Sequence, residues 1–507
     1  MESYPKKTLS QKYNDVMPTG AGALFLIQIF STLSFSVLYS TLILYATKGL
    51  RLNDTLATSI TGSFIALNYF LHLLGGYLGG RYLSYRGLFI FGMSLQIVGC
   101  SLISIPTVSN LLWGLAVFLA GCGLNVTCIN CMVTQLFEPN DKRREAAFLW
   151  NYSGMNIGFF IGFSIGGYFH LRHGYHELFI LSALGNVVAF CLAIYNWKLL
   201  KDRHTTFIES HPRVQRRNQW IGLSSIVLLM LALRVLLEHT ALCNQLIVII
   251  GASILIFLII LAFNQPTMVE KNKMLGFVVL AISSLVFWTL YQMAPMGLNL
   301  FIERNVDRHF MGILIAPQWI QNINTVVIIF GGPILSFVFT HLRESGYNIN
   351  IPFQFSLALI LIGISLAILP IGISFANPEG FTAFSWVFAS YVLTSIGELF
   401  ISPIGYAMVG QLAPMRLRGF MMGSWMMITG IAAIISDLFS KMALGVTETT
   451  DPLLTNASYS QTFNILGWSA IVAGAVLFVL IPFLTRLIQE KKIAKYEKLQ
   501  LSEQSVT

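Results

Sequence analysis

Long apolar runs recur along the whole chain and are separated by short polar segments. A run of about 20 residues is enough for a helix to cross a hydrocarbon core roughly 30 Å thick. The sequence contains fourteen such runs, and each predicts one membrane-spanning helix. They lie near residues 18–46, 56–80, 87–105, 109–137, 144–170, 177–197, 219–237, 241–263, 274–302, 317–341, 351–374, 381–411, 417–440 and 462–487.

A long polar interruption at residues 198–218 divides these runs into groups. Six runs precede it, two follow it directly, and six more complete the chain. Two groups of six spans are typical of transporters built from repeated halves, and they favour a transporter over a channel. We therefore predict four regions: an N-terminal six-helix bundle (1–197), a cytoplasmic linker with two additional helices (198–273), a C-terminal six-helix bundle (274–490) and a cytoplasmic tail (491–507).

The composition excludes several classes of protein. Hydrophobic residues make up 55% of the 507 residues and charged residues only 10%, whereas soluble domains carry about 25% charge. A soluble enzyme, a nucleic-acid binder and a disordered scaffold would all need more polar cover than this. The first 17 residues are polar and the following apolar run is too long for a cleavable signal peptide. The sequence predicts an all-α integral membrane protein in a lipid bilayer.

The positive charge reports topology and gives no sign of a nucleic-acid partner. The net charge is +9, and the basic residues lie mainly in alternate loops. With the N-terminus in the cytoplasm, 24 of the 31 Lys and Arg residues fall on the cytoplasmic side. Because cytoplasmic loops of membrane proteins are enriched in Lys and Arg, this bias predicts that both termini are cytoplasmic.

One intramembrane charge stands out as a functional candidate. Glu398 lies in the middle of the 381–411 run, shortly before Pro403. A charge at that depth costs at least about 2.5–3.5 kcal/mol, so an intramembrane acid asks for an explanation. A buried carboxylate can bind an amine or carry a proton, or it can be a protonated group that only bonds a neighbouring helix. His72 in the second run allows the same two interpretations, proton switch or helix contact.

Polar amides and tryptophans inside the runs are further candidates for a binding site. Buried amides can hold helices together or line a cavity, and periodicity does not separate these roles. Tryptophan side chains can be interfacial anchors or pocket walls. The residues in question include Asn156, Gln292, Asn324 and Trp425.

Neither a metal site nor an enzyme is expected. All six cysteines lie in apolar segments, and the pair Cys128 and Cys131 has no second pair or histidine cluster to complete a zinc site. The sequence contains no nucleophile–base pair and no phosphate-binding loop. We expect no cofactor.

The segment between the second and third runs resembles a known loop motif. It reads Gly75-Gly76-Tyr77-Leu78-Gly79-Gly80-Arg81-Tyr82-Leu83-Ser84-Tyr85-Arg86. It is similar to the gating loop of the major facilitator superfamily, in which Arg81 and Arg86 would be the motif's basic residues. Gly80 stands where the superfamily usually has an aspartate, so the customary charge contact of this loop is not expected here.

Several longer stretches resemble one family within that superfamily. The most specific runs from Gly397-Glu398-Leu399-Phe400-Ile401-Ser402-Pro403-Ile404-Gly405 to Leu412-Ala413-Pro414-Met415-Arg416-Leu417-Arg418-Gly419. Together with Asp141–Phe148 and Pro317-Gln318-Trp319, it is similar to the proton-dependent oligopeptide transporters. The two additional spans match the bacterial branch of that family. The resemblance implies the major facilitator fold, alternating access, and a bacterial inner membrane.

Some functional positions of that family are changed here. The E-x-x-E-R motif of the first helix is replaced by Gln28, Ser31 and Thr32, and a peptide-binding tyrosine further along by Ser36. The fourth-helix lysine corresponds to Val126. The seventh-helix carboxylate is also absent, with Gln292 or Met293 nearby.

The positions that match the family's amine-binding side are kept. They are Asn156, Asn324 and Glu398, with Tyr69 and Trp425 as candidate walls. Because the cations that would meet a substrate carboxylate are missing, a free carboxylate at the other end would be desolvated without a partner. We expect a substrate with an amine or a peptide-like polar head and no obligatory free carboxylate.

Three functions stay open at this point. The first is a secondary transporter of a peptide or peptide-like solute, with proton coupling atypical or lost on the N-terminal half. Glu398 and His72 are then the candidates for the proton site. The second is an exporter or exchanger of a small amide-bearing metabolite such as a siderophore. The third is a non-transporting sensor or scaffold on a transporter fold.

Overall fold

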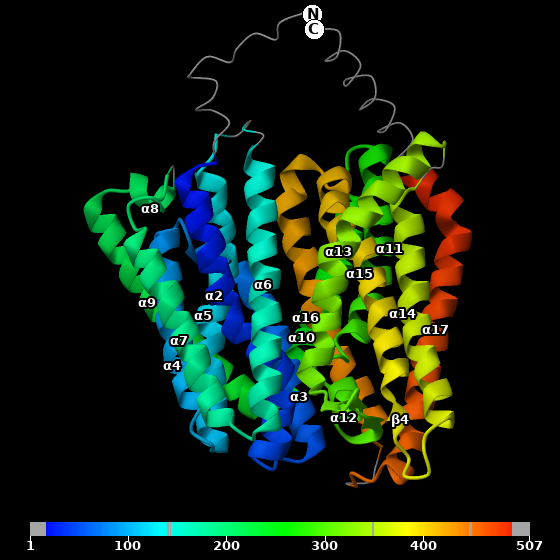
Figure 1. Ribbon diagram of the computed structural model, residues 1–507. Coiled ribbons are helices and arrows are strands. Elements are labelled where there is room, and N and C mark those ends of the chain that lie inside the picture. Colours follow the sequence, from blue (N-terminus) through cyan, green and yellow to red (C-terminus); the bar gives the residue numbers. More distant parts are fainter. Residues whose placement is uncertain are drawn as a thin grey trace, which may run out of the picture. The chain divides into compact units, whose positions relative to one another are not determined.

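The structure is a computed structural model that describes residues 17–138, 141, 143–203, 205–346, 349–445 and 449–488. Each of the fourteen predicted spans contains one long helix in this part of the chain, and one span also includes a second, shorter helix (Figure 1). The long helices are α2 (Thr19–Leu44), α3 (Asp54–Leu78), α4 (Tyr85–Ile103), α5 (Val108–Gln135), α6 (Arg143–Leu171), α7 (Tyr175–Tyr195), α9 (Pro212–Glu238), α10 (Thr240–Phe263), α11 (Met268–Tyr291), α13 (Pro317–Glu344), α14 (Ile351–Ser374), α15 (Phe384–Leu412), α16 (Arg418–Leu444) and α17 (Pro452–Leu487).

Thirteen of these helices are long and apolar enough to cross a membrane. The remaining one, α6, has 29 residues but no stretch that is apolar enough by the same measure. The helical membrane-protein class is therefore confirmed. The 6 + 2 + 6 count of crossings, the cytoplasmic location of the termini and the four predicted regions stay predictions.

The structure corrects one predicted span. The run at 274–302 is two helices, because α11 ends at Tyr291 and α12 (Gly297–Asn305) starts after a turn. Pro295 lies in that turn and explains the break, since proline has no backbone N–H and disfavours helical conformation at the residue before it. The last run starts earlier than predicted, at Pro452, because Asp451 caps the backbone N–H of Leu453.

Short elements complete the described chain. They are η1 (Tyr45–Gly49), α8 (Thr206–Glu209), η2 (Met415–Leu417) and four two-residue strands. Strand β1 (Val306–Asp307) pairs in parallel with β4 (Thr382–Ala383), and β2 (His309–Phe310) pairs antiparallel with β3 (Ile313–Leu314). Strands of this length close loops and leave the all-α class unchanged.

The contacts divide the chain into two compact units. Unit 1 contains the described residues of Met1–Leu38 and Leu71–Glu238, and unit 2 those of Tyr39–Phe70 and His239–Thr507. The boundary falls inside α2 and α3, so each of these helices contributes to both units. Of the two additional helices, α9 belongs to unit 1 and α10 to unit 2.

Unit 1 is held together by close contacts between helix backbones. Gly154, Gly158 and Gly162 recur once per turn along α6 and face α2. A Cβ atom on Gly158 would lie 2.6 Å from the carbonyl oxygen of Ile29. Small residues at this spacing let two helix backbones approach each other, as is usual for packing in membranes. In the same unit, α4 packs along α5 and α7.

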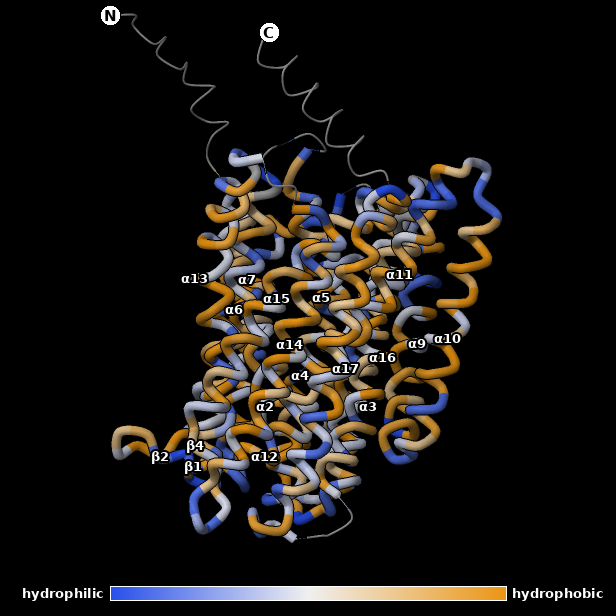
Figure 2. Tube along the Cα trace, turned by 90° about the vertical axis from the view of Figure 1, so that its right-hand side faces the viewer, coloured by the Kyte–Doolittle hydropathy of each residue, from blue (hydrophilic) through white to orange (hydrophobic). Residues whose placement is uncertain are grey.

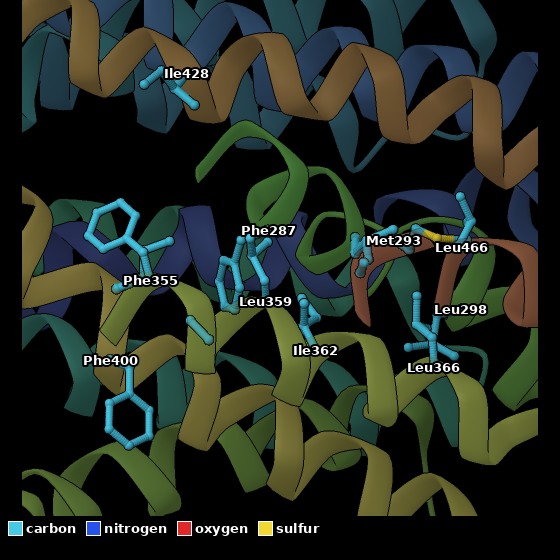
Figure 3. Close-up of a cluster of buried hydrophobic side chains, with 14 of the residues drawn as sticks. Phe287, Met293, Leu298, Phe355, Leu359, Ile362, Leu366, Phe400, Ile428 and Leu466 are labelled. Carbon is cyan, nitrogen blue, oxygen red and sulfur yellow. The ribbon is translucent and has the colours of Figure 1, made fainter. Parts of the chain in front are cut away.

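Unit 2 has a large hydrophobic core. Its side chains come from α11, α12, α14, α15, α16 and α17, and they include Phe287, Phe355, Phe400 and Leu466 (Figure 3). The helices α14 and α17 lie side by side. At their crossing a Cβ atom on Gly363 would lie 2.7 Å from the carbonyl oxygen of Gly467. Glycine at this crossing lets the two backbones come into contact.

The second additional helix, α10, presents apolar side chains to its surroundings. Figure 2 shows α10 in hydrophobic colours along much of its length, and Val248, Ile249, Ile256 and Phe257 are exposed. A helix that is apolar on its exposed side is suited to contact with lipid. On α9, Arg234 is paired with Glu238 at 2.7 Å and lies over the ring of Trp113.

Ion pairs join the 39–70 segment to the rest of unit 2. The guanidinium of Arg304 donates two hydrogen bonds to the carboxylate of Asp54, at 2.5 and 2.8 Å. Lys48 pairs with Glu303, which also pairs with Arg308 at 3.2 Å. Bidentate guanidinium–carboxylate pairs are strong and specific in geometry, so this segment is fixed to α12.

A buried acid near the end of α16 has several partners. One carboxylate oxygen of Asp437 accepts hydrogen bonds from Lys441 at 2.8 Å and from Asn244 of α10 at 3.0 Å. Ser59 of α3 donates to the same oxygen at 3.4 Å. The carboxylate therefore joins α3, α10 and α16.

Candidate functional site

Helix α15 places Glu398 inside unit 2. Gly397 precedes it, and a Cβ atom there would lie 3.2 Å from the ring of Phe287 and 3.3 Å from the carbonyl oxygen of Ala358. The small residue therefore lets α15 pack closely against α11 and α14. Pro403 lies within the same helix. Because proline donates no backbone hydrogen bond, it frees a carbonyl one turn earlier and permits a bend beside the acid.

The carboxylate of Glu398 is buried and bonded to neutral groups. Its Oε2 accepts a 2.7 Å hydrogen bond from Nδ2 of Asn324 on α13. The same amide group donates to Oγ of Ser395 at 3.2 Å, and Ser395 donates to the carbonyl of Tyr391 at 2.6 Å. The hydroxyl of Tyr291 also hydrogen-bonds Glu398. Two of the predicted site residues, Glu398 and Asn324, are thus hydrogen-bonded to each other.

Gln292 connects two further tyrosines to this site. The break after α11 leaves Gln292 at the helix end, where it is 1% exposed. Its Oε1 accepts a 2.9 Å hydrogen bond from the hydroxyl of Tyr39, and Tyr69 hydrogen-bonds it as well. Tyr39 and Tyr69 both interact electrostatically with Glu398. The structure therefore brings Glu398, Asn324, Gln292 and Tyr69 together.

Sequence reasoning missed Tyr39, Tyr291 and Ser395. Tyr39 lies one helical turn after Ser36, the position where the expected tyrosine was absent, so the helical repeat places it on nearly the same face. Tyr291 directly precedes Gln292. Both tyrosines count as apolar members of a run, and only Tyr291 lies beside the turn that contains Pro295.

The arrangement has two chemical capacities. A carboxylate surrounded by an amide and hydroxyl groups has no fixed cation beside it among the groups described here. It can therefore hold a proton, or it can receive an ammonium group whose charge it balances. The aromatic faces around it can add cation–π attraction to a bound amine.

A small cavity borders the site. Tyr291 and Tyr391 line it together with Ser365 and Thr394, whose hydroxyls lie 2.6 Å apart. Its volume of about 20 Å³ is sufficient for one water molecule and too small for a peptide.

Trp425 contacts α15 away from the acid. Its indole ring fills the space beside Gly405, roughly two helical turns after Glu398, and lies 6.1 Å from the ring of Phe355. These contacts fit helix packing. The role of Trp425 as a wall of the binding site stays a prediction.

Two predicted site residues belong to unit 1. Asn156 is buried in α6, and its amide donates a 2.9 Å hydrogen bond to the carbonyl of Tyr152 in its own helix. His72 is buried in α3, and its backbone carbonyl accepts a 2.7 Å hydrogen bond from Thr127. Their roles in substrate binding and proton coupling stay predictions.

The loop-motif arginines are also in unit 1. Arg81 lies over the ring of Tyr77. Arg86 lies over the ring of Trp197 and donates to its carbonyl at 2.7 Å. Both side chains hold local structure at the cytoplasmic end predicted for this loop, and their part in gating stays a prediction.

Comparison with known proteins identifies the family. The profile of the POT family matches residues 86–460, well over half of the chain. The chain belongs to the POT family. The match includes Glu398, Asn324, Tyr291 and Gln292, whereas Tyr39 and Tyr69 precede it. The resemblance to proton-dependent oligopeptide transporters is thus confirmed.

Curated relatives of this POT-family chain are bacterial permeases. It is 28% identical over 481 residues to dipeptide and tripeptide permease A of Chromobacterium violaceum, covering 94% of this chain and 95% of the relative. The permease of the same name from Escherichia coli K12 is also 28% identical, with 94% of both chains covered. The chain is accordingly a multi-pass plasma-membrane protein related to transporters.

Solved structures show the same fold. A peptide transporter POT in complex with sulfate has a TM-score of 0.80 at 24% identity, covering 93% of this chain and 96% of that chain. A POT family transporter in complex with 5-aminolevulinic acid has a TM-score of 0.79 at 24% identity, covering 92% and 97%. The predicted major facilitator fold is thus confirmed.

The residues predicted to replace the family's first-helix motif are neutral and are hydrogen-bonded within the group. Nε2 of Gln28 donates a 2.7 Å hydrogen bond to Oγ1 of Thr32, and Ser31 donates to the carbonyl of Gln28. All three side chains are buried.

Among the described residues, no group of three or more His, Cys, Asp or Glu side chains could hold a metal ion.

Proposed function

We propose that this POT-family chain is a secondary active transporter that moves a peptide or a peptide-like solute across the membrane by alternating access. The family match, the names of the curated relatives and the fold support this proposal. The observation that carries it is the buried carboxylate of Glu398, bonded to Asn324 and Tyr291. A buried acid with neutral partners is suited to a reversible cation, either a proton or the amine of a substrate.

The proposed substrate has an amine at one end and no obligatory carboxylate at the other. Glu398 would accept the amine, with Asn324 beside it. On the N-terminal half, Gln28, Thr32 and Val126 provide no charge where the family carries charged residues. An isolated carboxylate pays a large desolvation penalty unless a cation meets it. Amides and esters at that end avoid this penalty.

Proton coupling in this chain would depend on the C-terminal half. The first-helix carboxylates are missing, and the amide of Gln292 stands near the position of the seventh-helix carboxylate. Gln292 accepts hydrogen bonds from Tyr39 and Tyr69 without titrating. Glu398 is then the leading proton site of unit 2, and coupling that depends on the N-terminal half is atypical or lost.

The same loss of charge is consistent with a second transport function. An exporter or exchanger of an amide-bearing metabolite would not need proton-driven import, and neutral residues at Gln28 and Thr32 favour this. A non-transporting sensor is less well supported, because the bonded group of Glu398, Asn324 and Tyr291 is retained.

The direct test uses purified protein in liposomes. Uptake and counterflow of labelled dipeptides and tripeptides would be measured with a proton gradient imposed or absent, for wild type and Glu398→Gln. Exchange of peptides or peptide amides that is lost in the variant supports the proposal. No movement of any peptide form, with active export of a metabolite, would favour the second function. No movement of any solute would favour the sensor.

A further inference from the structure

The loop between α3 and α4 forms a tight turn at Gly80. The backbone N–H of Gly80 donates to the carbonyl of Leu83 at 2.7 Å, and Gly79 and Leu83 form an isolated bridge. Gly80 has a φ of +72°, in the left-handed region that glycine adopts readily. This is the position where the superfamily motif carries an aspartate.

A side chain at position 80 would crowd the ring of Tyr85. A Cβ atom on Gly80 would lie 2.9 Å from the hydroxyl oxygen of Tyr85 and 3.0 Å from two ring carbons. Glycine adopts this positive φ without strain, whereas most other residues do so at a cost and aspartate and asparagine tolerate it best. Residues 79–84 include no acidic side chain, so a carboxylate beside this loop comes from another segment of the chain.

Asp202, in the linker after α7, provides such a carboxylate. It is 2% exposed, although it lies in a polar connection between helices. Its Oδ2 accepts a 2.6 Å hydrogen bond from the backbone N–H of Tyr85, and its Oδ1 accepts a 3.3 Å bond from the N–H of Arg86. These are the first two residues of α4. The N–H of Gly87 is bonded by the hydroxyl of Ser84.

The bonds of Asp202 satisfy groups that a helix start cannot satisfy by itself. The first N–H groups of a helix have no partner within the helix, and the helix dipole favours a negative charge there. The guanidinium of Arg86 adds a favourable charge interaction with Asp202. Substituting a capping side chain by alanine costs about 0.5–2 kcal/mol.

The rest of the linker holds the same loop. Thr206 Oγ1 and the backbone N–H of Phe207 both donate to the carbonyl of Gly80 at 2.9 Å. The N–H of Arg203 donates to Oε1 of Gln135 on α5 at 3.1 Å. Gly222 of α9 leaves room for Leu83. The linker is therefore fixed to the loop, to α4 and to α5.

We infer that Asp202 is a positioning residue that replaces the missing loop carboxylate from the linker. It holds the 79–84 loop and the start of α4 in place. Through this contact, the linker that leads to the two additional helices supports the transport cycle. The inference rests on the proposed transport function for its kinetic consequence. The contacts of Asp202 can be tested without transport.

The test combines a local reporter with uptake kinetics. Cys131 on α5 hydrogen-bonds Tyr85 and interacts with the charge of Asp202, so its thiol lies beside the capped helix start. In a full-length variant that keeps Cys131 as its single cysteine, alkylation by N-ethylmaleimide reports opening of this region. Asp202→Ala should raise the alkylation rate about tenfold, in line with loss of a helix cap. It should lower the maximal uptake rate and leave KM unchanged.

A matched control and a rescue separate positioning from general instability. Asp451→Ala also removes an aspartate that caps a long helix, but in unit 2, and it should leave Cys131 alkylation unchanged. Asp202→Asn keeps one carbonyl acceptor. Its Cys131 alkylation rate and its maximal uptake rate should both lie between those of Asp202→Ala and wild type. If Asp202→Ala does not fold, Thr206→Val removes a bond to Gly80 and should show the same two changes in weaker form.

Three results would overturn the inference. In the first, Asp202→Ala labels at Cys131 like wild type. In the second, it labels faster but transports at the wild-type rate, so the contact has no role in transport. In the third, Asp451→Ala raises labelling equally. If wild type itself moves no solute, the proposed function fails, and the Cys131 result still decides the structural part.

Discussion

The amide nitrogen of Asn324 lies 2.7 Å from a carboxylate oxygen of Glu398, inside unit 2 and on a different helix. This hydrogen bond orients the acid without neutralising it, because an amide carries no charge. The hydroxyl of Tyr291 is a second neutral donor. The positive charge that completes the site therefore has to arrive with a proton or a substrate.

Replacing Glu398 by Gln tests the need for that charge. Glutamine has the same shape and keeps an acceptor for Asn324, so the thermal stability of the protein should change little. Transport should fall by more than about tenfold, because the site can no longer balance an amine or release a proton. The measurement is counterflow at equal amounts of folded protein.

The exposed Glu379 offers a matched control. Glu379→Gln removes one carboxylate from a loop of the same unit and should transport like wild type. A Glu398→Gln protein that retains wild-type transport would contradict the assigned role of the acid.

Replacing Asn324 by Ala should weaken substrate binding more than it slows the transport cycle. The carboxylate would lose its best-placed donor, and a hydrogen bond to a charged group contributes about 1.5–3 kcal/mol. We expect KM to rise by about tenfold or more, with a smaller change in the maximal rate. Ser395→Ala removes only the longer 3.2 Å partner of the same amide and should have a smaller effect. Equal effects of the two variants would be inconsistent with this site.

The ion pair between Arg304 and Asp54 should stabilise unit 2 measurably. Both side chains are mostly buried, at 13% and 26% exposure, and the pair is bidentate. A double-mutant cycle with Asp54→Ala and Arg304→Ala, measured by thermal unfolding in detergent, should give a coupling free energy of about 2 kcal/mol.

The pair of Arg234 and Glu238 is a suitable comparison within the same protein. Glu238 is 52% exposed and the two residues are one turn apart in α9. Its coupling should be about 0.5 kcal/mol, typical of exposed pairs. If the two cycles give the same small value, the 39–70 segment is not held by its charges.

Asp202 should make the stability of the protein depend on pH in a defined direction. Burial raises the pKa of this carboxyl above its ordinary value of 3.8, although the N–H groups of Tyr85 and Arg86 and the charge of Arg86 oppose the shift. With a raised pKa the folded protein binds more protons than the unfolded chain. The contribution of Asp202 to stability is therefore greatest below pH 3.8 and decreases as the pH rises to the folded-state pKa.

The difference between wild type and Asp202→Asn isolates this effect. The variant keeps every other titrating group near position 202, including the thiols of Cys128 and Cys131. The melting temperature of wild type relative to the variant should fall as pH rises from about 4 and level off above the folded-state pKa. A relative melting temperature that rises with pH would contradict the burial of this carboxyl.

The sequence predicts the presence of the helices better than it predicts where they break, start and end. Apolar runs such as 351–374 coincide with the observed helix, because length and composition decide which segments can cross a membrane. The break after Tyr291 was missed, although Pro295 is a local signal for it. Helix α17 starts at Pro452, ten residues before the predicted start at residue 462, because Asp451 caps it there.

The site is predictable only in part. Glu398 and Asn324 could be selected because polar residues are rare and costly inside a membrane. Tyr39 and Tyr291 could not, since a tyrosine counts as apolar in such a run and the partner of its hydroxyl depends on tertiary packing. Asp202 could not be selected either, because an acid in a polar linker gives no sign in the sequence that it caps α4.

In the proposed function, Glu398 binds a peptide-like solute that needs no free carboxylate. Counterflow in liposomes, with the same dipeptide supplied in free and C-terminally amidated form and no proton gradient, tests it most directly. We expect the amidated peptide to exchange at least as fast as the free one, and Glu398→Gln to abolish both exchanges. A strong preference for the free peptide would contradict this binding mode.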